Sequence, residues 1–318
     1  MVEPLVSVIT PCYNGESYLA RYMDSLLEQT YNNVEFILIN DGSNDKTEQI
    51  ALSYQNQFQR RGFKFIYIYQ KNAGQAAAVN QGLKIVTGKY LIWPDSDDIL
   101  EKDSIKVRVE YLEKNPDKGM VAGKCKVVDE KNLNKVIDLQ YNSTDDNWVE
   151  NLYFSGKYST LPGIYMVRLE CLFNIYPEKQ IFESSEDQNF QILLPMAYYY
   201  PYGRINNFVY KYVVRQSSHS HMKRTINELI LRSNNFIILA RAIIELFDDE
   251  EYKKVYFNKV YNYEKRDQFI YSIQFDDINI VEECYQTICA RKICSYKDRL
   301  KYWRYRVKMF FINKLNTK

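Results

Sequence analysis

Three aspartates stand within four residues directly after an apolar run: Asp95, Asp97 and Asp98 in the segment YLIWPDSDD. Carboxylates at this density repel one another unless a cation joins them. Hard oxygen ligands of this kind suit Mg²⁺ or Mn²⁺, which also bind substrate phosphates. The alternative is a turn at the end of a strand, in which one aspartate caps the next helix. That alternative explains one aspartate well and three poorly, so the spacing predicts a divalent-cation site.

Three more polar segments follow apolar runs: TPCYNGE at 10–16, NDGSND at 40–45 and QKNAGQ at 70–75. Asp41 is either ordinary turn chemistry or an acceptor for the imide of a nucleobase. Tyr13 either stacks on a base or is a buried ring. None of these glycine-containing segments has the spacing G-x-G-x-x-G or G-x-x-x-x-G-K-[ST], which disfavours dinucleotide binding of the Rossmann type and a P-loop.

Alternating strands and helices are expected to position these segments. The expected strands are 5–10, 34–40, 63–69 and 90–93, and the expected helices are 17–29, 45–61, 75–86 and 103–114. Near-continuous apolar strands joined by helices predict a parallel sheet that is covered on both faces. In such a sheet ligands bind beyond the carboxyl ends of the strands, so the four polar segments should converge on one crevice.

The pattern weakens after residue 115. A fifth strand is expected at 120–128, a loop-like region at 129–151, a mixed region with one helix at 161–173 and 181–194, and a strand at 208–215. Helices are expected at 226–247 and 251–269, followed by a basic tail. The polar stretch 216–224 marks the expected boundary, which predicts domains at 1–222 and 223–318.

The run from Val6 to Leu100 resembles an inverting glycosyltransferase of family 2, of the bacterial surface-glycan type. The matching pieces, in order, are VSVITPCYNGESYLARYMDSLLEQTY, VEFILINDGSNDKT, NAGQAAAVNQGL and GKYLIWPDSDDIL. The resemblance covers about the first 220 residues. It implies the GT-A fold, an α/β fold with a mostly parallel sheet flanked by helices and a Rossmann-like nucleotide-sugar half. A helical extension would follow at the C-terminus.

The resemblance also implies roles for the donor side. Pro11 and Tyr13 would line a uridine pocket, Glu16 would lie beside it, Asp41 would read the uracil edge, and Lys71 or Asn72 would approach the nucleotide. Asp95, Ser96 and Asp97 would form the DxD motif. In that motif Asp95 lies near the ribose and the sugar, and Asp97 binds the metal that bridges the diphosphate. Asp98 would be an acidic neighbour or a helix cap.

On the acceptor side, Glu186 and Asp187 in SSEDQNFQILL match the late acidic pair of the family. Asp187 would be the general base, with Glu186 supporting it or contacting the acceptor; the alternative is two acids that suit a helix N-terminus. His219 would be a further metal ligand, or else His219 and His221 are exposed imidazoles. Arg215 would neutralise diphosphate or carry surface charge. The aromatic residues Tyr153, Phe154, Tyr158 and Tyr165 would stack on acceptor sugars or belong to the core.

The net charge of +2 hides an asymmetry. Residues 285–318 hold ten basic residues and one acidic residue, a net +9, and the rest of the chain carries −7. An apolar stripe of Leu300, Trp303, Val307, Phe310 and Phe311 is flanked by Lys301, Arg306 and Lys308. This pattern fits either a helix at a membrane surface or a helix packed on the catalytic domain. Nucleic acid is disfavoured, because no binding motif accompanies the charge.

Together these features predict a metal-dependent inverting transferase of hexosyl or N-acetylhexosaminyl groups. The donor would be a UDP-sugar, the cofactor Mn²⁺ or Mg²⁺, and the acceptor a saccharide, lipid-linked or glycoprotein glycan of a capsule or cell wall. The sequence has no secretory signal and no charge-free apolar window, which predicts a cytoplasmic protein. Two further possibilities stay open: a peripheral position on the inner face of the plasma membrane, and assembly into a homo-oligomer. Two alternatives are a nucleotidyltransferase, although TPCYNGES lacks Lys and Arg, and an inactive binding module, although PDSDD and SSED are intact.

Overall fold

A computed structural model describes residues 3–141, 148–154, 159–186, 189–215 and 224–316. The chain divides into two compact units, Met1–His221 and Met222–Lys318, here called unit 1 and unit 2. Each unit is described by itself.

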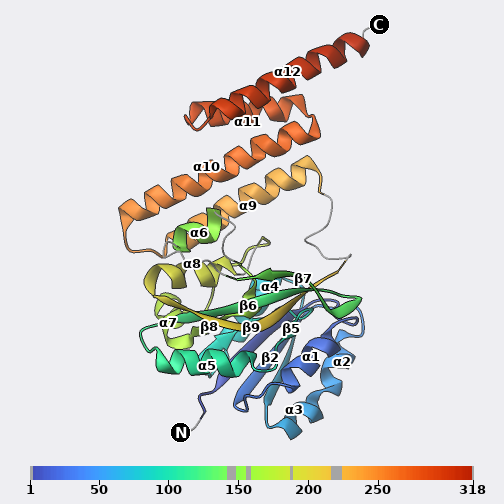
Figure 1. The fold of residues 1–318 in the computed structure, drawn as a ribbon, viewed down its shortest axis with the longest axis vertical. Helices are drawn as coiled ribbons and strands as arrows, with labels where there is room; N and C mark the ends of the chain where they lie inside the picture. Colours follow the sequence, from blue (N-terminus) through green and yellow to red (C-terminus); the bar gives the residue numbers. More distant parts are fainter. Residues whose placement is uncertain (1–2, 142–147, 155–158, 187–188, 216–223, 317–318) are drawn as a thin grey trace. The chain divides into compact units, whose positions relative to one another are not determined.

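Unit 1 contains strands and helices in alternation through its first half (Figure 1). Its elements are β1 Val6–Cys12, α1 Leu19–Leu27, β2 Val34–Asp41, α2 Thr47–Ser53, α3 Gln55–Arg61, β3 Lys64–Gln70, α4 Gln75–Leu83, β4 Tyr90–Ile92, β5 Ile99–Leu100, α5 Ser104–Lys114, β6 Met120–Asp129, β7 Asn132–Gln140, α6 Trp148–Phe154, the 3₁₀ turn η1 Pro162–Ile164, β8 Tyr165–Arg168, α7 Leu169–Ile175, α8 Phe190–Tyr199 and β9 Tyr202–Val214.

One sheet runs through unit 1 in the order β3-β2-β1-β4-β8-β6-β9-β5, with β7 paired to β6. β1 pairs in parallel with β2 and β4, and β2 pairs in parallel with β3, whereas β8 is antiparallel to β4 and β6. Every residue of β1 and β2 is buried, because α4 packs on both strands and other helices cover the sheet. The predicted α/β class is confirmed.

The structure differs from the sequence expectations mainly after residue 129. The region expected to be a loop contains β7, whose residues are mostly exposed and therefore show no strand periodicity. The mixed region holds α7 and α8 rather than one helix, and the expected helix at 45–61 is divided into α2 and α3 around Tyr54.

A buried carboxylate connects the amino ends of β1, β2 and β4 through hydrogen bonds. Glu35 on β2 accepts hydrogen bonds from Ser7 Oγ on β1 at 2.6 Å, from Thr87 N at 2.6 Å and Thr87 Oγ1 at 2.8 Å, and from Gly88 N at 3.1 Å. Burial alone would raise the pKa of Glu35, but the hydrogen bonds from Ser7 and Thr87 outweigh it and hold the pKa below its usual value. The charged carboxylate therefore stabilises the junction of three strands.

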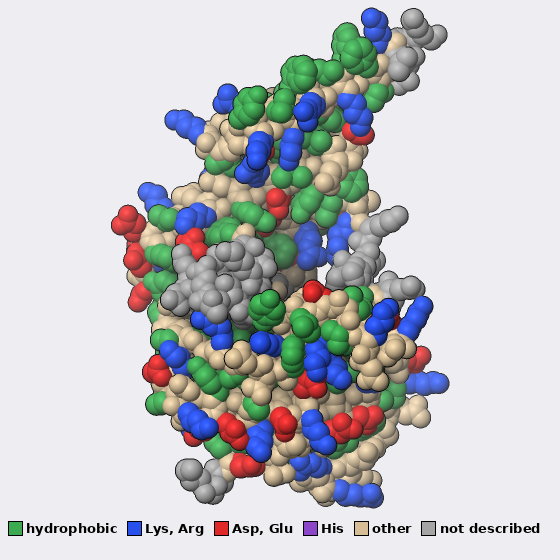
Figure 2. Space-filling model, viewed as in Figure 1, with side chains coloured by type: hydrophobic (Ala, Val, Ile, Leu, Met, Phe, Trp, Pro, Cys, Tyr) green, Lys and Arg blue, Asp and Glu red, His purple; other side chains and the backbone are tan. Residues whose placement is uncertain are grey.

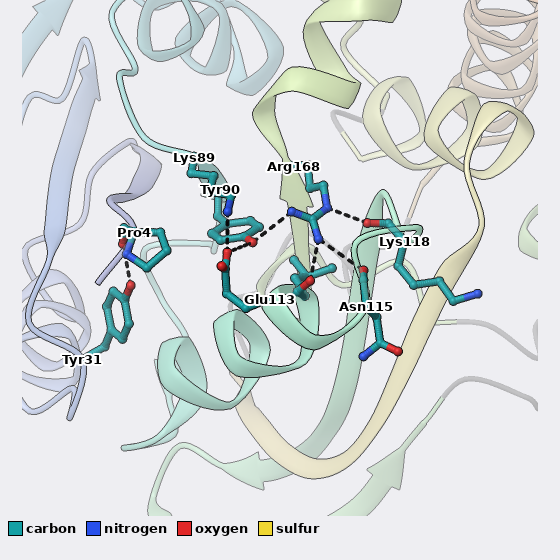
Figure 3. A network of polar contacts seen from close by, with 9 residues as sticks. Pro4, Tyr31, Lys89, Tyr90, Glu113, Asn115, Lys118 and Arg168 are labelled. Atoms are coloured by element: carbon teal, nitrogen blue, oxygen red, sulfur yellow. Dashed lines mark hydrogen bonds and ion pairs between the residues drawn. The ribbon is translucent and has the colours of Figure 1, made fainter. Parts of the chain in front are cut away.

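A second network joins β4, β8 and the end of α5 (Figure 3). The Arg168 guanidinium donates to the carbonyls of Leu112, Asn115 and Lys118 and to the Tyr90 hydroxyl. A cation at a helix C-terminus is favourable because it faces unpaired carbonyl groups and the negative end of the helix dipole. Lys89 Nζ lies 2.6 Å from the Glu113 carboxylate, which also accepts from Tyr90. The amino end of β4 is therefore fixed on α5.

Unit 2 is entirely helical within residues 224–316. Its helices are α9 Ile226–Ile244, α10 Glu250–Phe275, α11 Ile278–Ala290 and α12 Tyr296–Asn316. Phe269, Ile288 and Tyr305 belong to a buried cluster against which Tyr302 and Met309 pack. The face of α12 that packs inside unit 2 is thus formed by 302, 305 and 309, not by the predicted stripe. None of the helices in the described ranges is long and apolar enough to cross a bilayer.

Replacing Glu35 by Gln should lower the free energy of unfolding at pH 7 by about 3 kcal/mol, because an amide cannot accept all the donors that face it. The native pKa lies below the unfolded one, so the charge stabilises the fold above the unfolded pKa and this contribution is lost as the pH falls through the native pKa. Urea unfolding should therefore show a smaller difference in the free energy of unfolding between wild type and variant at about pH 3 than at pH 7. The exposed Glu110→Gln on α5 is the control, and an equal loss in both variants would contradict the assignment.

Candidate active site

The carboxyl ends of β1, β2 and β4 open into one cavity of about 280 Å³. Its lining contains eight of the residues that the sequence singled out: Pro11, Tyr13, Asp41, Asn72, Asp95, Ser96, Asp97 and Arg215. It also contains Cys12, Tyr18, Gly74 and Gln75. The parallel register of β1 with both β2 and β4 brings segments 30 to 80 residues apart in sequence to the same edge, as a parallel sheet requires.

Asp41 fixes the loop that precedes α4. One carboxylate oxygen accepts from Gln70 Nε2 at 2.7 Å and from Ala73 N at 2.9 Å, and the other accepts from Gly74 N at 2.9 Å. A carboxylate has about four lone-pair sites, so three donors leave one site for a ligand. Asp41 is only 4% exposed, yet it lines the cavity. It can therefore hold the loop and still accept one hydrogen bond from a ligand.

Gly42 permits the close approach of that loop. Its φ is +76°, a conformation that favours glycine, and a Cβ at this position would lie 2.6 Å from the Asn72 amide nitrogen. The turn after β2 and the loop after β3 are thus packed backbone against backbone, which places Asn72 on the cavity wall.

The three aspartates do come together. Asp95, Asp97 and Asp98 each offer an oxygen within 4.8 Å of the others, and within the described residues no other group of three candidate metal ligands is this compact. Gln75 Nε2 at the start of α4 donates to Asp95 at 3.1 Å. Hard carboxylate oxygens that converge in this way fit Mg²⁺ or Mn²⁺. The residues therefore satisfy the donor chemistry that such a cation needs.

Asp98 is buried behind the other two. It accepts a hydrogen bond from Val213 N on β9 at 2.8 Å. Burial raises the pKa of Asp98, and the negative charges of Asp97 and Asp95 raise it further. The hydroxyl of Tyr210, which is also on β9 and buried, accepts a hydrogen bond from the Asp95 backbone N–H at 3.2 Å. Asp98 thus attaches the aspartate turn to β9, while Asp95 and Asp97 line the cavity.

Asp97 faces two arginines. Arg215, directly after β9, forms an ion pair with its carboxylate, and Arg21 on α1 donates to its backbone carbonyl at 2.7 Å. The Arg215 guanidinium also lies over the Tyr18 ring, 4.4 Å from the centroid. Positive charge is therefore already present at the point where the sequence predicts a cation and a diphosphate.

Cys12 is the one thiol among the cavity-lining residues of the described chain. Burial raises its pKa to about 12, which keeps the thiol protonated and unreactive at neutral pH. The cavity thus has carboxylates for acid–base and cation chemistry but no activated cysteine nucleophile.

Two predicted donor-side residues do not line the cavity. Glu16 accepts from Lys46 N at 3.1 Å, and its own N–H donates to Asp45 at 2.9 Å, so it joins the loop after β1 to the start of α2. Lys71 is an exposed residue of the loop after β3. Tyr13 lies on the cavity wall with 43% of its surface exposed, so its ring is available to a ligand.

On the acceptor side, Glu186 is half-buried and its N–H donates to Ser184 Oγ at 3.1 Å. Asp187, His219 and Tyr158 lie outside the described residues. Tyr165 is fully buried and belongs to the core, whereas Tyr153 and Phe154 on α6 are half-buried and Tyr153 lies 5.5 Å from the Phe190 ring at the start of α8.

Two residues to which the sequence assigned no role in the site hold Ile181, Glu183 and Asn189 in place. Asn80 on α4 donates to the Ile181 carbonyl at 3.0 Å and to Glu183 at 3.1 Å, and it accepts from Ile181 N at 2.9 Å. Trp93, just after β4, donates through Nε1 to Asn189 Oδ1 at 3.0 Å. Ile181 and Glu183 are thus attached to α4, and Asn189 is attached to the residue that follows β4.

The sequence contains one signal for Asn80. It stands four residues after Ala76 and three before Leu83, on the apolar stripe of α4, and a polar residue there must find a partner when buried. No comparable signal distinguishes Trp93 from an ordinary core residue.

Replacing Trp93 by Phe should loosen the chain around Asn189 and leave the donor-side loops unchanged, because an aromatic ring stays buried while the hydrogen bond to Asn189 is lost. A loss of about 1 kcal/mol would speed amide exchange around Asn189 about fivefold. Hydrogen–deuterium exchange read by mass spectrometry checks this, with exchange in 70–75 as the internal reference and the exposed Trp303→Phe as the control. Unchanged exchange around Asn189 would contradict the positioning role.

Comparison with known proteins agrees with this geometry. The family model described as glycosyl transferase family 2 matches residues 7–172, slightly more than half of the chain. A relative from Rickettsia prowazekii (strain Madrid E), named uncharacterized glycosyltransferase RP339, is 43% identical over 119 residues. That alignment covers 37% of this chain and 35% of the relative, so the match spans about a third of the relative's length.

Solved structures share the fold at low sequence identity. S. aureus TarS 1-349 in complex with UDP-GlcNAc has a TM-score of 0.59 and 17% identity, covering 96% of this chain and 92% of that one. The mannosyltransferase PcManGT from Pyrobaculum calidifontis, in complex with GDP-Man and Mn²⁺, has a TM-score of 0.55 and 14% identity, covering 97% and 87%. These likenesses concern the fold, whereas the family model identifies the lineage: the chain belongs to glycosyl transferase family 2.

Proposed function

We propose that the protein is a metal-dependent inverting glycosyltransferase that moves a hexosyl or N-acetylhexosaminyl group from a UDP-sugar to an acceptor hydroxyl. The observation that carries this proposal is the cavity itself. It brings an exposed aromatic ring, Tyr13, and a carboxylate with one free acceptor site, Asp41, beside the carboxylate pair Asp95 and Asp97. These are the groups that a nucleobase and a cation-bound diphosphate need.

The donor side favours a uracil nucleotide. Tyr13 offers a face on which a base can stack, with Pro11 beside it. The remaining lone pair of Asp41 suits the single imide N–H of uracil. TarS, which shares the fold, binds UDP-GlcNAc and UDP, whereas PcManGT binds GDP-Man. Asn72 on the same wall, with Lys71 next to it in the chain, would contact the nucleotide from its edge. Glu16, three residues after Tyr13, would lie beside the uridine pocket.

Asp95 and Asp97 would hold the divalent cation, with Ser96 between them facing the donor and His219 as a further ligand. When bound, Mn²⁺ or Mg²⁺ would offset the charge that the leaving diphosphate gains. Asp98 would contribute indirectly, because its hydrogen bond with Val213 fixes the turn on which both ligands stand.

Transfer with inversion needs a base on the acceptor side. The acceptor oxygen would attack the anomeric carbon as the bond to the diphosphate oxygen breaks, and Asp187 would take the hydroxyl proton. Glu186 would support Asp187 or contact the acceptor. Asn80 and Trp93 would keep this segment at a fixed distance from the donor turn, which is how a site holds two reactants in line.

Replacing Asp187 by Asn should lower the turnover number at least about 100-fold, because the amide cannot accept the proton. The affinity for UDP in the presence of Mn²⁺ should stay within about twofold of wild type, since the residue does not hold the donor. UDP release from a panel of UDP-sugars and UDP calorimetry measure the two quantities. The exposed Glu178→Gln should change neither; loss of UDP binding in Asp187→Asn would refute the role as base.

The acceptor would be a saccharide, lipid-linked or glycoprotein glycan of a capsule or cell wall. Tyr153 and Phe154, beside Phe190, would supply rings for sugar stacking next to the acidic pair. The catalytic domain would comprise 1–222 and the helical extension 223–318, in a cytoplasmic protein.

The extension would bring the enzyme to the inner face of the plasma membrane. On α12 the side chains of Trp303, Phe310 and Phe311 are 61%, 63% and 59% exposed. They recur at helical spacing on the side opposite the packed Tyr305. Figure 2 shows hydrophobic and basic side chains mixed along this helix. A helix with exposed aromatic rings and a net positive charge suits an anionic lipid surface, where the rings enter the headgroup region.

Replacing both Trp303 and Phe310 by Ala should weaken binding to vesicles that contain anionic lipid at least about tenfold, because two large apolar side chains no longer enter the interface. Vesicle sedimentation measures the affinity. The matched control replaces Leu231 and Ile238 on α9, which are 60% and 57% exposed, by Ala and should leave binding unchanged. Equal vesicle binding by wild type and the α12 variant would refute the membrane role.

A further inference from the structure

Arg215 occupies an unusual position for a residue at the end of a strand. Its side chain is 16% exposed and pairs with the Asp97 carboxylate, which is 27% exposed. The ring of Tyr18 supports its guanidinium from the other side. Arg215 also lines the cavity that the donor would enter. It therefore contacts a predicted cation ligand and the donor space at the same time.

The ion pair between Arg215 and Asp97 offsets negative charge in the aspartate cluster. Carboxylate oxygens of Asp95, Asp97 and Asp98 lie within 4.8 Å of one another, so a positive charge close by stabilises the charged carboxylates when no cation is bound. Arginine cannot give up its proton at neutral pH, so Arg215 can release Asp97 only by moving away. A cation that binds Asp97 must then displace the guanidinium from that carboxylate.

Diphosphate offers Arg215 a new partner. Guanidinium groups bind phosphate oxygens through two parallel hydrogen bonds, and Arg215 already faces the space in which a diphosphate would lie. We propose that Arg215 is an exchangeable counter-ion, which pairs with Asp97 in the empty site and passes to the donor diphosphate as the nucleotide binds. This inference rests on the proposed function, because it assumes a nucleoside diphosphate donor.

The exchange couples two binding events. In the empty site Arg215 competes with a cation for Asp97, and Asp97 competes with the diphosphate for Arg215. A bound cation therefore frees Arg215 for the nucleotide, and a bound nucleotide frees Asp97 for the cation, so that each raises the affinity for the other by the same factor. Donor binding would thus require both components, without any change in the sheet.

A double-mutant cycle measured without metal tests the exchange. In EDTA, Asp97→Asn should raise the affinity for UDP about tenfold in the Arg215 background, because it frees the guanidinium for the diphosphate. In the Arg215→Gln background the same change should raise the affinity far less, by no more than about twofold, since only general repulsion is removed. An equal gain in both backgrounds would overturn the proposal.

A second measurement uses Mn²⁺ alone. Arg215→Gln should bind Mn²⁺ several-fold more tightly than wild type when no nucleotide is present, and UDP should raise its Mn²⁺ affinity less than it raises that of wild type. Electron paramagnetic resonance of free Mn²⁺ gives both affinities. Arg215→Lys keeps the positive charge but loses the two parallel donors of the guanidinium, so its Mn²⁺ affinity should lie between those of wild type and Arg215→Gln.

Arg204→Gln is the matched control, because Arg204 stands on β9 but outside the cavity lining, and it should behave as wild type in both measurements. An unchanged melting temperature confirms that each variant is folded. If wild type binds neither UDP nor Mn²⁺, the proposed function itself falls. If wild type binds both and the Arg215 variants do not differ from it, only the exchange is refuted.

Discussion

Repulsion among three carboxylates at the end of β4 is the constraint that the surrounding structure satisfies. Asp98 is buried and hydrogen-bonded to β9, Asp97 pairs with Arg215, and Asp95 accepts from Gln75 at the start of α4. Each aspartate thus has a different partner: one lies on β9, one directly after it and one on α4. Arg21 on α1 also holds the backbone carbonyl of Asp97, so three elements around the turn keep the cluster compact.

The two ends of the parallel sheet have opposite properties. At the amino ends of the strands, Glu35 and Arg168 are held by several hydrogen bonds each, and these contacts connect β1, β2, β4, β8 and α5. At the carboxyl ends the polar groups, among them Asp41, Asp95 and Asp97, face a cavity. Rigidity at one end allows the other to keep charged groups close together without losing the fold.

The first half of unit 1 was predictable because β1, β2 and β4 are buried on both faces and read as continuous apolar runs. The polar segments that follow them could be placed on one edge for the same reason. β7 was missed because its exposed residues have no periodicity, and the sequence left the place of Tyr165 open because a ring gives no sign of its burial. The partners of Glu16, Trp93 and Arg215 depend on distant segments, which local sequence does not encode.

Helix α4 connects the loop around Asp41 with Ile181. Its first turn begins at the amides that bind Asp41, and its Asn80 holds Ile181. Asn80 stands six positions after Gly74, which corresponds to about 9 Å along a helix axis. The helix therefore sets the distance between the loop that Asp41 holds and Ile181, which Asn80 holds. Inserting one residue into it would turn Asn80 by about 100°, so this spacing can tolerate substitutions but not changes in length.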